Sequence, residues 1–125
     1  PGGTETILFV DDDRKLVYLG KKMLEDLGYT VIALSSSSDA LDTFKNEPDK
    51  FDIIITDQTM PEKTGTDLVK NILSIRPELP VILSTGYSDM ITAEKAKKIG
   101  IREFTMKPFD IRVMAKLIRK VLDEK

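Results

Sequence analysis

The sequence contains no cysteine and no histidine. The first absence excludes disulfides, thiolate metal ligands and thiol catalysis, and the second excludes imidazole as a general base, a zinc ligand or a phosphoryl carrier. Neither a Gly-x-x-x-x-Gly-Lys-Ser/Thr motif nor a Gly-x-Gly-x-x-Gly motif follows the first apolar run, so the common nucleotide-binding loops are missing. Any chemistry must therefore come from carboxylates, amines, guanidinium groups, hydroxyls and the backbone.

Long apolar runs and a large net charge are missing as well. No run approaches the ~20 residues that a membrane-spanning helix needs, and a formal net charge of −2 gives no sign of non-specific nucleic-acid binding. The 125 residues suit one domain that folds without a disulfide or a structural metal. Because the chain starts at Pro1, we expect a piece of a longer or processed protein, with residues 1–5 as a linker remnant and residues 6–125 as the domain.

Five short apolar runs predict the strands of this domain. The first four are continuous rather than alternating, which is typical of strands buried on both faces of a parallel sheet. The runs cover residues 7–10, 30–34, 52–56, 81–84 and, more weakly, 103–106. Successive runs begin about 22 to 29 residues apart, which leaves room for one helix and two short loops between them.

Stripes of apolar residues at helical spacing lie between these runs and after the last one. They predict five helices, within residues 16–27, 40–44, 68–75, 93–99 and 111–122. The expected N-caps are residues 37–39 for the second helix, Ser88 or Asp89 for the fourth and Asp110 for the fifth. Gly28, Pro77 and Gly100 are the expected helix stops. Alternating strands and helices predict an α/β fold, a doubly wound (βα)5 parallel sheet.

The polar residues after the strands predict the site. In such sheets, sites form beyond the carboxyl ends of the strands, near the point where the strand order reverses. The side chains expected at those ends are those of Asp11, Asp12, Asp13, Asp57, Thr85 and Lys107. With strand order 2-1-3-4-5, the first and third strands are neighbours, so the carboxylates after the first strand face Asp57.

The chemistry of this set points to phosphoryl transfer. Clustered carboxylates repel one another unless a cation joins them, and hard oxygen ligands suit Mg²⁺, which favours a phosphate oxygen as a further ligand. Thr85 and Lys107 then supply a hydroxyl donor and a positive charge, and an Asp carboxylate can itself be the nucleophile that becomes an acyl phosphate. An Asp after a strand is more often a helix cap or turn residue, and we assign Asp13 to that role.

Five motifs, in order and at the right spacing, resemble the receiver domain of two-component response regulators. They are residues 7–13, 57–61, Gly65, residues 80–86 and residues 107–109. The resemblance covers nearly the whole chain and implies the flavodoxin-like, CheY-like fold with sheet order 2-1-3-4-5. It also implies a cytoplasmic phosphoprotein of a phosphorelay, with at most slow autophosphatase activity.

The resemblance assigns roles to the predicted site residues. It implies that Asp57 accepts a phosphoryl group from the phosphohistidine of a histidine kinase or a histidine phosphotransfer domain. It implies that Mg²⁺ is held by Asp11, Asp12, Asp57 and the backbone carbonyl of Thr59. Thr85 would hydrogen-bond the phosphoryl group and Lys107 would pair with it.

The resemblance also implies a conformational switch. Thr85 and Phe104 would act as switch residues that change the face formed by the fourth helix, the fifth strand and the fifth helix. Phe104 stands where Tyr is more usual, so any hydrogen bond of a Tyr hydroxyl is lost. The Lys107–Pro108 bond would be cis, which is least costly before proline.

The parent protein and the partners are less closely defined by the sequence. Residues 2–8, 56–61 and 84–88 resemble most the receivers at the carboxyl end of hybrid sensor histidine kinases, and a stand-alone response regulator is the other interpretation. We expect no contact of this domain with nucleic acid or membrane, and the sequence leaves open whether two copies form a homodimer.

Two alternative functions compete with the phosphoacceptor. A small phosphatase of the haloacid dehalogenase type would use Asp11 and Asp13 as its Asp-x-Asp motif, but Lys15 stands where that motif usually has Thr or Val. The other alternative is an interaction module that keeps the fold without being phosphorylated.

Overall fold

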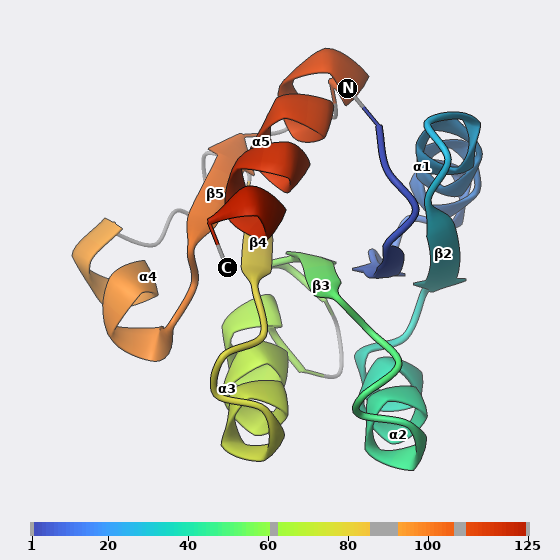
Figure 1. The fold of residues 1–125 in the computed structure, drawn as a ribbon. Coiled ribbons are helices and arrows are strands. Elements are labelled where there is room, and N and C mark those ends of the chain that lie inside the picture. Colours follow the sequence, from blue (N-terminus) through green and yellow to red (C-terminus); the bar gives the residue numbers. More distant parts are fainter. Residues whose placement is uncertain (1, 61–62, 86–92, 107–109, 125) are drawn as a thin grey trace.

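The computed structural model describes residues 2–60, 63–85, 93–106 and 110–124. Five parallel strands form one sheet with the order β2-β1-β3-β4-β5 (Figure 1), as predicted. The strands are β1 (Thr6–Val10), β2 (Thr30–Leu34), β3 (Ile53–Asp57), β4 (Val81–Thr85) and β5 (Glu103–Met106). Each predicted strand agrees with the observed one to within one residue at either end.

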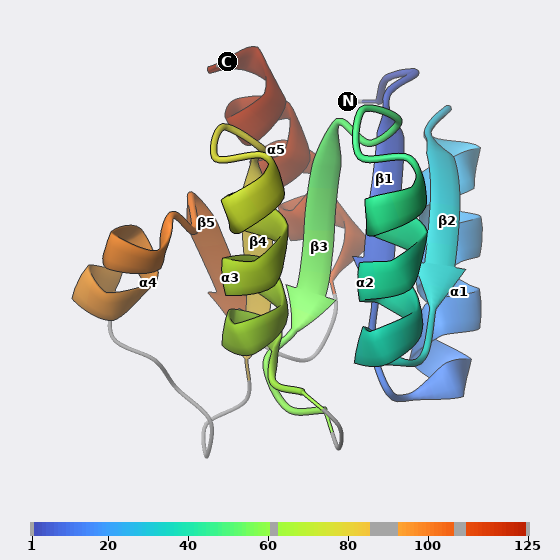
Figure 2. The ribbon, with the colours of Figure 1, turned by 90° about the horizontal axis from the view of Figure 1, so that it is seen from below.

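The helices form two layers, one on each face of the sheet. They are α1 (Arg14–Asp26), α2 (Ser37–Asn46), α3 (Gly65–Ile75), α4 (Ala93–Ile99) and α5 (Ile111–Asp123). Helices α1 and α5 cover one face, and α2, α3 and α4 cover the other (Figures 1 and 2). No helix among the described residues is both long and apolar enough to cross a membrane.

The two layers explain why the strand runs are continuously apolar. In β1, Ile7 and Phe9 pack into the cluster under α1 and α5, whereas Leu8 and Val10 pack into the cluster under α2 and α3. Successive strand residues point to opposite faces, and both faces are covered here. Every residue of β3 is accordingly buried.

The N-caps of α1 and α5 are the predicted residues, whereas that of α2 is not. Asp13 caps α1 by accepting hydrogen bonds from the Lys15 and Leu16 amides, and Asp110 caps α5. The prediction that residues 37–39 cap α2 was wrong, because Ser36 is the residue with extended backbone, and its hydroxyl accepts from the Asp39 amide. Residues 37–39 already lie within the helix, and only a residue outside the helical turn can cap it.

Two glycines end helices with left-handed backbone, as predicted. Gly28 follows α1 with φ of 103° and Gly100 follows α4 with φ of 109°, a conformation that side chains disfavour. Helix α3 ends at Ile75, two residues before Pro77. The two residues predicted to cap α4, Ser88 and Asp89, lie outside the described part of the chain.

Residues 2–5 contact the folded body. The Gly3 amide donates to the Leu27 carbonyl at 3.1 Å, and the Arg119 guanidinium of α5 forms two bonds with the Glu5 carboxylate, 2.9 and 3.1 Å long. Arg119 also contacts Asp123 one turn further along α5. This ion-pair network joins the two ends of the chain.

The Glu5–Arg119 ion pair should make stability depend on pH. Its hydrogen bond lowers the pKa of Glu5 below the usual value of 4.5, so the contribution is present above that value and is lost as the pH falls through the lower pKa of the folded state. We expect Glu5→Gln to reduce the free energy of unfolding by about 0.5–1 kcal/mol at neutral pH. In urea unfolding, the difference from wild type should vanish in acid.

Glu47→Gln is the matched control for this prediction. Glu47 pairs with Lys50 at 3.8 Å, but its side chain is 67% exposed, so its loss should change stability little at any pH. Equal effects of the two substitutions would contradict a specific role of the Arg119 pair.

Candidate functional site

Three carboxylates meet at the carboxyl edge of the sheet. Asp11 directly follows β1, and Asp57 is the last residue of the neighbouring β3. One carboxylate oxygen from each of Asp11, Asp12 and Asp57 lies within 4.8 Å of the others. Asp11 and Asp57 are 2% and 3% exposed, whereas Asp12 is exposed. Residues from two separate runs of the sequence are thus brought together at this edge.

The carboxylates of Asp11 and Asp13 accept hydrogen bonds from different backbone amides. The Asp11 amide donates to the Leu34 carbonyl at the end of β2, and its Oδ1 accepts from the Asp13 amide at 2.9 Å. The Asp13 carboxylate bonds instead to the first amides of α1. The consecutive acidic residues therefore divide between the carboxylate cluster and the helix cap, with Asp13 in the cap as predicted.

The main chain around Asp57 is held on both sides. The following amide, that of Gln58, donates to the Ser84 carbonyl of β4 at 2.9 Å. The Thr56 hydroxyl donates to the Asp57 carbonyl. A methyl group on Gly65 would lie only 2.2 Å from that carbonyl oxygen, so the start of α3 packs directly against Asp57.

The other predicted site residues lie around this edge or outside the described residues. Thr85 ends β4 and is 1% exposed. Phe104 lies in β5 opposite Leu83 and packs, half-buried, against the apolar cluster under α2 and α3. Lys107 and the Lys107–Pro108 bond lie outside the described residues.

Thr59 begins the loop after Gln58 and is exposed. The next side chain, Met60, is 6% exposed and packs in the apolar cluster under α2 and α3. An exposed residue is thus followed at once by a buried one, which anchors this first part of the β3–α3 loop to the core.

The donor set fits a hard divalent cation. All three side-chain donors are carboxylate oxygens, and their mutual spacing is close to that of ligands around one Mg²⁺, which lie up to about 4 Å apart. Two of the carboxylates are buried, so their mutual repulsion is poorly screened by water. A bound cation would relieve that repulsion.

A hydrogen-bond network beside the cluster could not be predicted from the sequence. The Gln58 side chain bonds to Thr66 at the start of α3, and Thr66 in turn contacts Thr64. A glutamine after an aspartate is not a recognisable motif, and its partner lies eight residues away across a loop.

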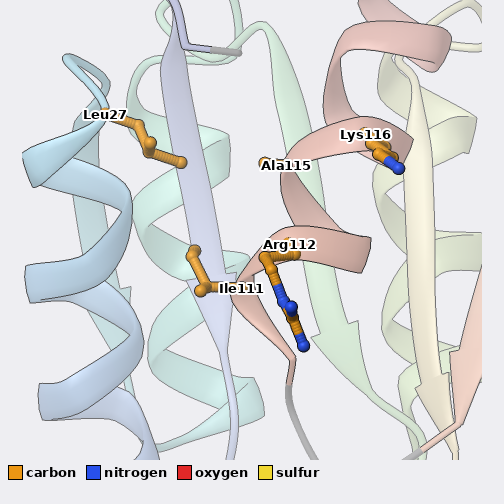
Figure 3. A pocket seen from close by; sticks show the side chains of 5 residues that line it. All are labelled: Leu27, Ile111, Arg112, Ala115 and Lys116. Atoms are coloured by element: carbon orange, nitrogen blue, oxygen red, sulfur yellow. The ribbon is translucent and has the colours of Figure 1, made fainter.

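A separate apolar cavity lies on another part of the surface. It measures about 330 Å³ and lies between the end of α1 and the first turns of α5 (Figure 3); its lining residues are Leu27, Ile111, Arg112, Ala115 and Lys116. This lining contains no carboxylate or hydroxyl side chain, so the cavity offers no carboxylate that could become an acyl phosphate.

Comparison with known proteins agrees with this geometry. A family model described as the response regulator receiver domain matches residues 7–119. The DNA-binding transcriptional regulator NtrC of Azospirillum brasilense is 34% identical over 94% of this chain and 24% of its own length. The sensor kinase CckA of Brucella abortus is 27% identical over 98% of this chain and 13% of its own length. The chain thus spans a quarter or less of these relatives.

Solved structures give the same result. A response regulator receiver domain protein from Clostridium thermocellum has a TM-score of 0.91 and 32% identity, over 96% of this chain and 95% of that one. A CheY-like receiver domain protein from Methanospirillum hungatei has a TM-score of 0.87 and 30% identity, over 98% and 96% of the two chains.

Proposed function

Because the chain belongs to the response regulator receiver domain family, the phosphoacceptor module of two-component signalling, we propose that Asp57 takes up the phosphoryl group. One observation carries this assignment. Asp57 is the buried carboxylate at the end of the central strand, within 4.8 Å of two other carboxylates. No other cluster of three such metal-ligating side chains occurs among the described residues.

The reaction follows from the position of Asp57. A carboxylate oxygen attacks the phosphorus of a phosphohistidine, a phosphorus–oxygen bond forms, and the phosphorus–nitrogen bond breaks. The imidazole of the donor leaves and takes up a proton, and Asp57 becomes an acyl phosphate. The burial of Asp57 keeps bulk water away from this carboxylate.

We propose that Asp11, Asp12, Asp57 and the Thr59 carbonyl hold Mg²⁺. When bound, Mg²⁺ supplies positive charge that offsets the charge of the phosphoryl oxygens. The acidic cluster supports this assignment for the three side chains, and the position of Thr59 at the start of the following loop supports it for the carbonyl.

We further propose that Thr85 and Lys107 contact the phosphoryl group and that Thr85 and Phe104 form the switch. Thr85 fits because it ends β4, the strand that pairs with β3. Phe104 fits because it lies on β5, next to β4. The resulting change would reach the surface formed by α4, β5 and α5.

Histidine kinases are the partners of two-component receivers, and we propose a cytoplasmic histidine kinase or histidine phosphotransfer domain as the donor. Residues 6–125 would be the receiver, without nucleic-acid or membrane contacts of its own. Both a transcriptional regulator and a sensor kinase are among its relatives, so the parent protein is either a hybrid kinase or a response regulator. A homodimer of the domain is compatible with both parents.

The haloacid dehalogenase alternative is not supported. It requires Asp11 and Asp13 to act together, but the Asp13 carboxylate bonds to the Lys15 and Leu16 amides as the cap of α1. The family match also lies with receiver domains.

A phosphorylation assay tests the proposed function. Incubation with a small acyl-phosphate donor and Mg²⁺ should add the mass of one phosphoryl group to the intact protein, and fragment mass spectrometry should locate it on Asp57. We expect Asp57→Asn to abolish the adduct, because a neutral amide is not a nucleophile for phosphorus.

Asp42→Asn, which changes an exposed carboxylate on α2, is the control and should be phosphorylated like wild type. An adduct on another residue would contradict the assignment to Asp57. The complete absence of an adduct would instead favour an interaction module that only keeps the fold.

A further inference from the structure

Gln58, the residue after the proposed acceptor, uses all four of its polar groups. Its amide donates to the Ser84 carbonyl, and its carbonyl accepts from the Gly65 amide, both at 2.9 Å. Its side-chain Oε1 accepts from the Thr66 amide at 2.9 Å, and its Nε2 donates to the Thr66 hydroxyl at 3.3 Å. Gln58 therefore closes the loop between β3 and α3 with both its backbone and its side chain.

The hydrogen bonds continue from Gln58 into the cap of α3 and meet at the Thr64 hydroxyl. Because the Thr66 hydroxyl accepts from Gln58, its own proton is free to point to the Thr64 hydroxyl, 3.1 Å away. The Thr64 hydroxyl in turn accepts from the Asp67 amide at 3.2 Å. A proton donor thus meets an acceptor at each step from Gln58 to the helix.

The first turn of α3 depends on these bonds. The first amides of a helix have no partner within the helix. Here the amides of Gly65 and Thr66 are bound by Gln58, and that of Asp67 is bound by Thr64. The end of the loop is thereby fixed to its beginning.

This closure bears on the site because Thr59 lies inside the loop. Its carbonyl is the proposed fourth protein ligand, next to Gln58 on one side and to the buried Met60 on the other. Mg²⁺ demands near-ideal ligand geometry, and a backbone carbonyl can meet this demand only when its peptide is held.

We propose that the Gln58 side chain is a positioning residue that holds the Thr59 carbonyl for the cation; this rests on the Mg²⁺ site of the proposed function. The amide does not touch the cation or the phosphoryl group. It acts by joining the start of α3 to the end of β3, so that the Thr59 peptide next to it has one orientation.

The test is a titration of Mg²⁺ into the protein by isothermal calorimetry. Gln58→Met keeps the length of the side chain and removes both of its hydrogen bonds. We expect the dissociation constant for Mg²⁺ to rise about 10-fold or more, the range found when a group that orients a metal ligand is removed. Thr66→Val keeps the bond to Oε1 and loses only the hydroxyl, so it should raise the constant by less.

Asn71→Met is the matched control. Its side-chain amide donates to the Asp67 carbonyl within the same helix, at 2.8 Å, so the substitution also replaces a hydrogen-bonding amide with a Met side chain, in α3 and without touching the loop. We expect its Mg²⁺ affinity to equal that of wild type. Urea unfolding without Mg²⁺ reports the stability of all variants separately, so weaker binding by both Met variants in proportion to lost stability would overturn the positioning role.

Two further outcomes have distinct meanings. Wild-type protein that binds Mg²⁺ and a Gln58→Met variant that binds it equally well would overturn only the positioning role. Wild-type protein that releases no binding heat and shows no shift of its melting temperature with Mg²⁺ would overturn the metal site, and the role of Gln58 with it.

Discussion

Gly65→Ala should both destabilise the protein and slow phosphorylation of Asp57. The added methyl group would lie 2.2 Å from the Asp57 carbonyl oxygen and 2.9 Å from the Leu83 side chain. A backbone oxygen in a central strand cannot move aside as a flexible side chain can, so α3 or the end of β3 must shift. We expect a loss of about 3 kcal/mol in the free energy of unfolding, the upper part of the range for overpacked sites.

The same shift should reach the reaction. A displacement of about 1 Å at a reacting group can cost about 100-fold in rate, and Asp57 is the residue that α3 would push. We therefore expect the initial rate of adduct formation, measured by intact mass spectrometry with a small acyl-phosphate donor, to fall by about 10-fold or more.

Gly20→Ala provides the comparison. Its added methyl group would lie 2.5 Å from the Phe9 ring, on the face covered by α1 and α5. This variant should also lose stability, but it should be phosphorylated at the wild-type rate under conditions where it stays folded. If Gly65→Ala were as reactive as Gly20→Ala, the close contact between α3 and Asp57 would have no part in the chemistry.

Asp11→Asn should stabilise the protein without Mg²⁺ and remove most of its response to Mg²⁺. The substitution removes one charge from three crowded carboxylates, and the amide oxygen can still accept the bond from the Asp13 amide. Without Mg²⁺, the variant should be more stable than wild type, by on the order of 1–3 kcal/mol. With Mg²⁺, wild type should be stabilised by about 2.7 kcal/mol at 100 times its dissociation constant, and the variant should gain little.

Asp13→Asn is the control, two residues further along the chain. Asparagine caps helices as well as aspartate does, so α1 should keep its cap and the Mg²⁺ response should stay that of wild type. Thermal unfolding with and without Mg²⁺ measures both variants. A wild-type-like Mg²⁺ shift in Asp11→Asn would show that Asp11 does not hold the cation.

The fold was largely predictable because its strands are buried on both faces. That burial leaves continuous apolar runs, and the strand ends follow from the polar residues after them, such as Asp11. The juxtaposition of Asp11 with Asp57 was predictable too, since both follow neighbouring parallel strands. No comparable regularity governs which member of a serine run caps a helix, and Ser36 was missed for that reason.

Contacts that depend on tertiary structure could not be read from the chain. Gln58 and Thr66 meet only because α3 starts beside the end of β3. Glu5 and Arg119 pair across 114 positions of sequence, and nothing local distinguishes Glu5 from any other acidic residue near a chain end. Side-chain bonds across loops depend on backbone geometry that only the packed fold defines.

The order of the strands also affects the rate at which the backbone amides around the site exchange hydrogen for deuterium. Strand β3 is bonded to a neighbour on each side, whereas β5 is the last of the five and is bonded to β4 alone. Edge segments open at lower free-energy cost than central ones. We therefore expect the amide of Asp57, the proposed acceptor, to exchange more slowly than that of Phe104, the proposed switch residue, in line with a fixed reaction centre beside a segment able to rearrange.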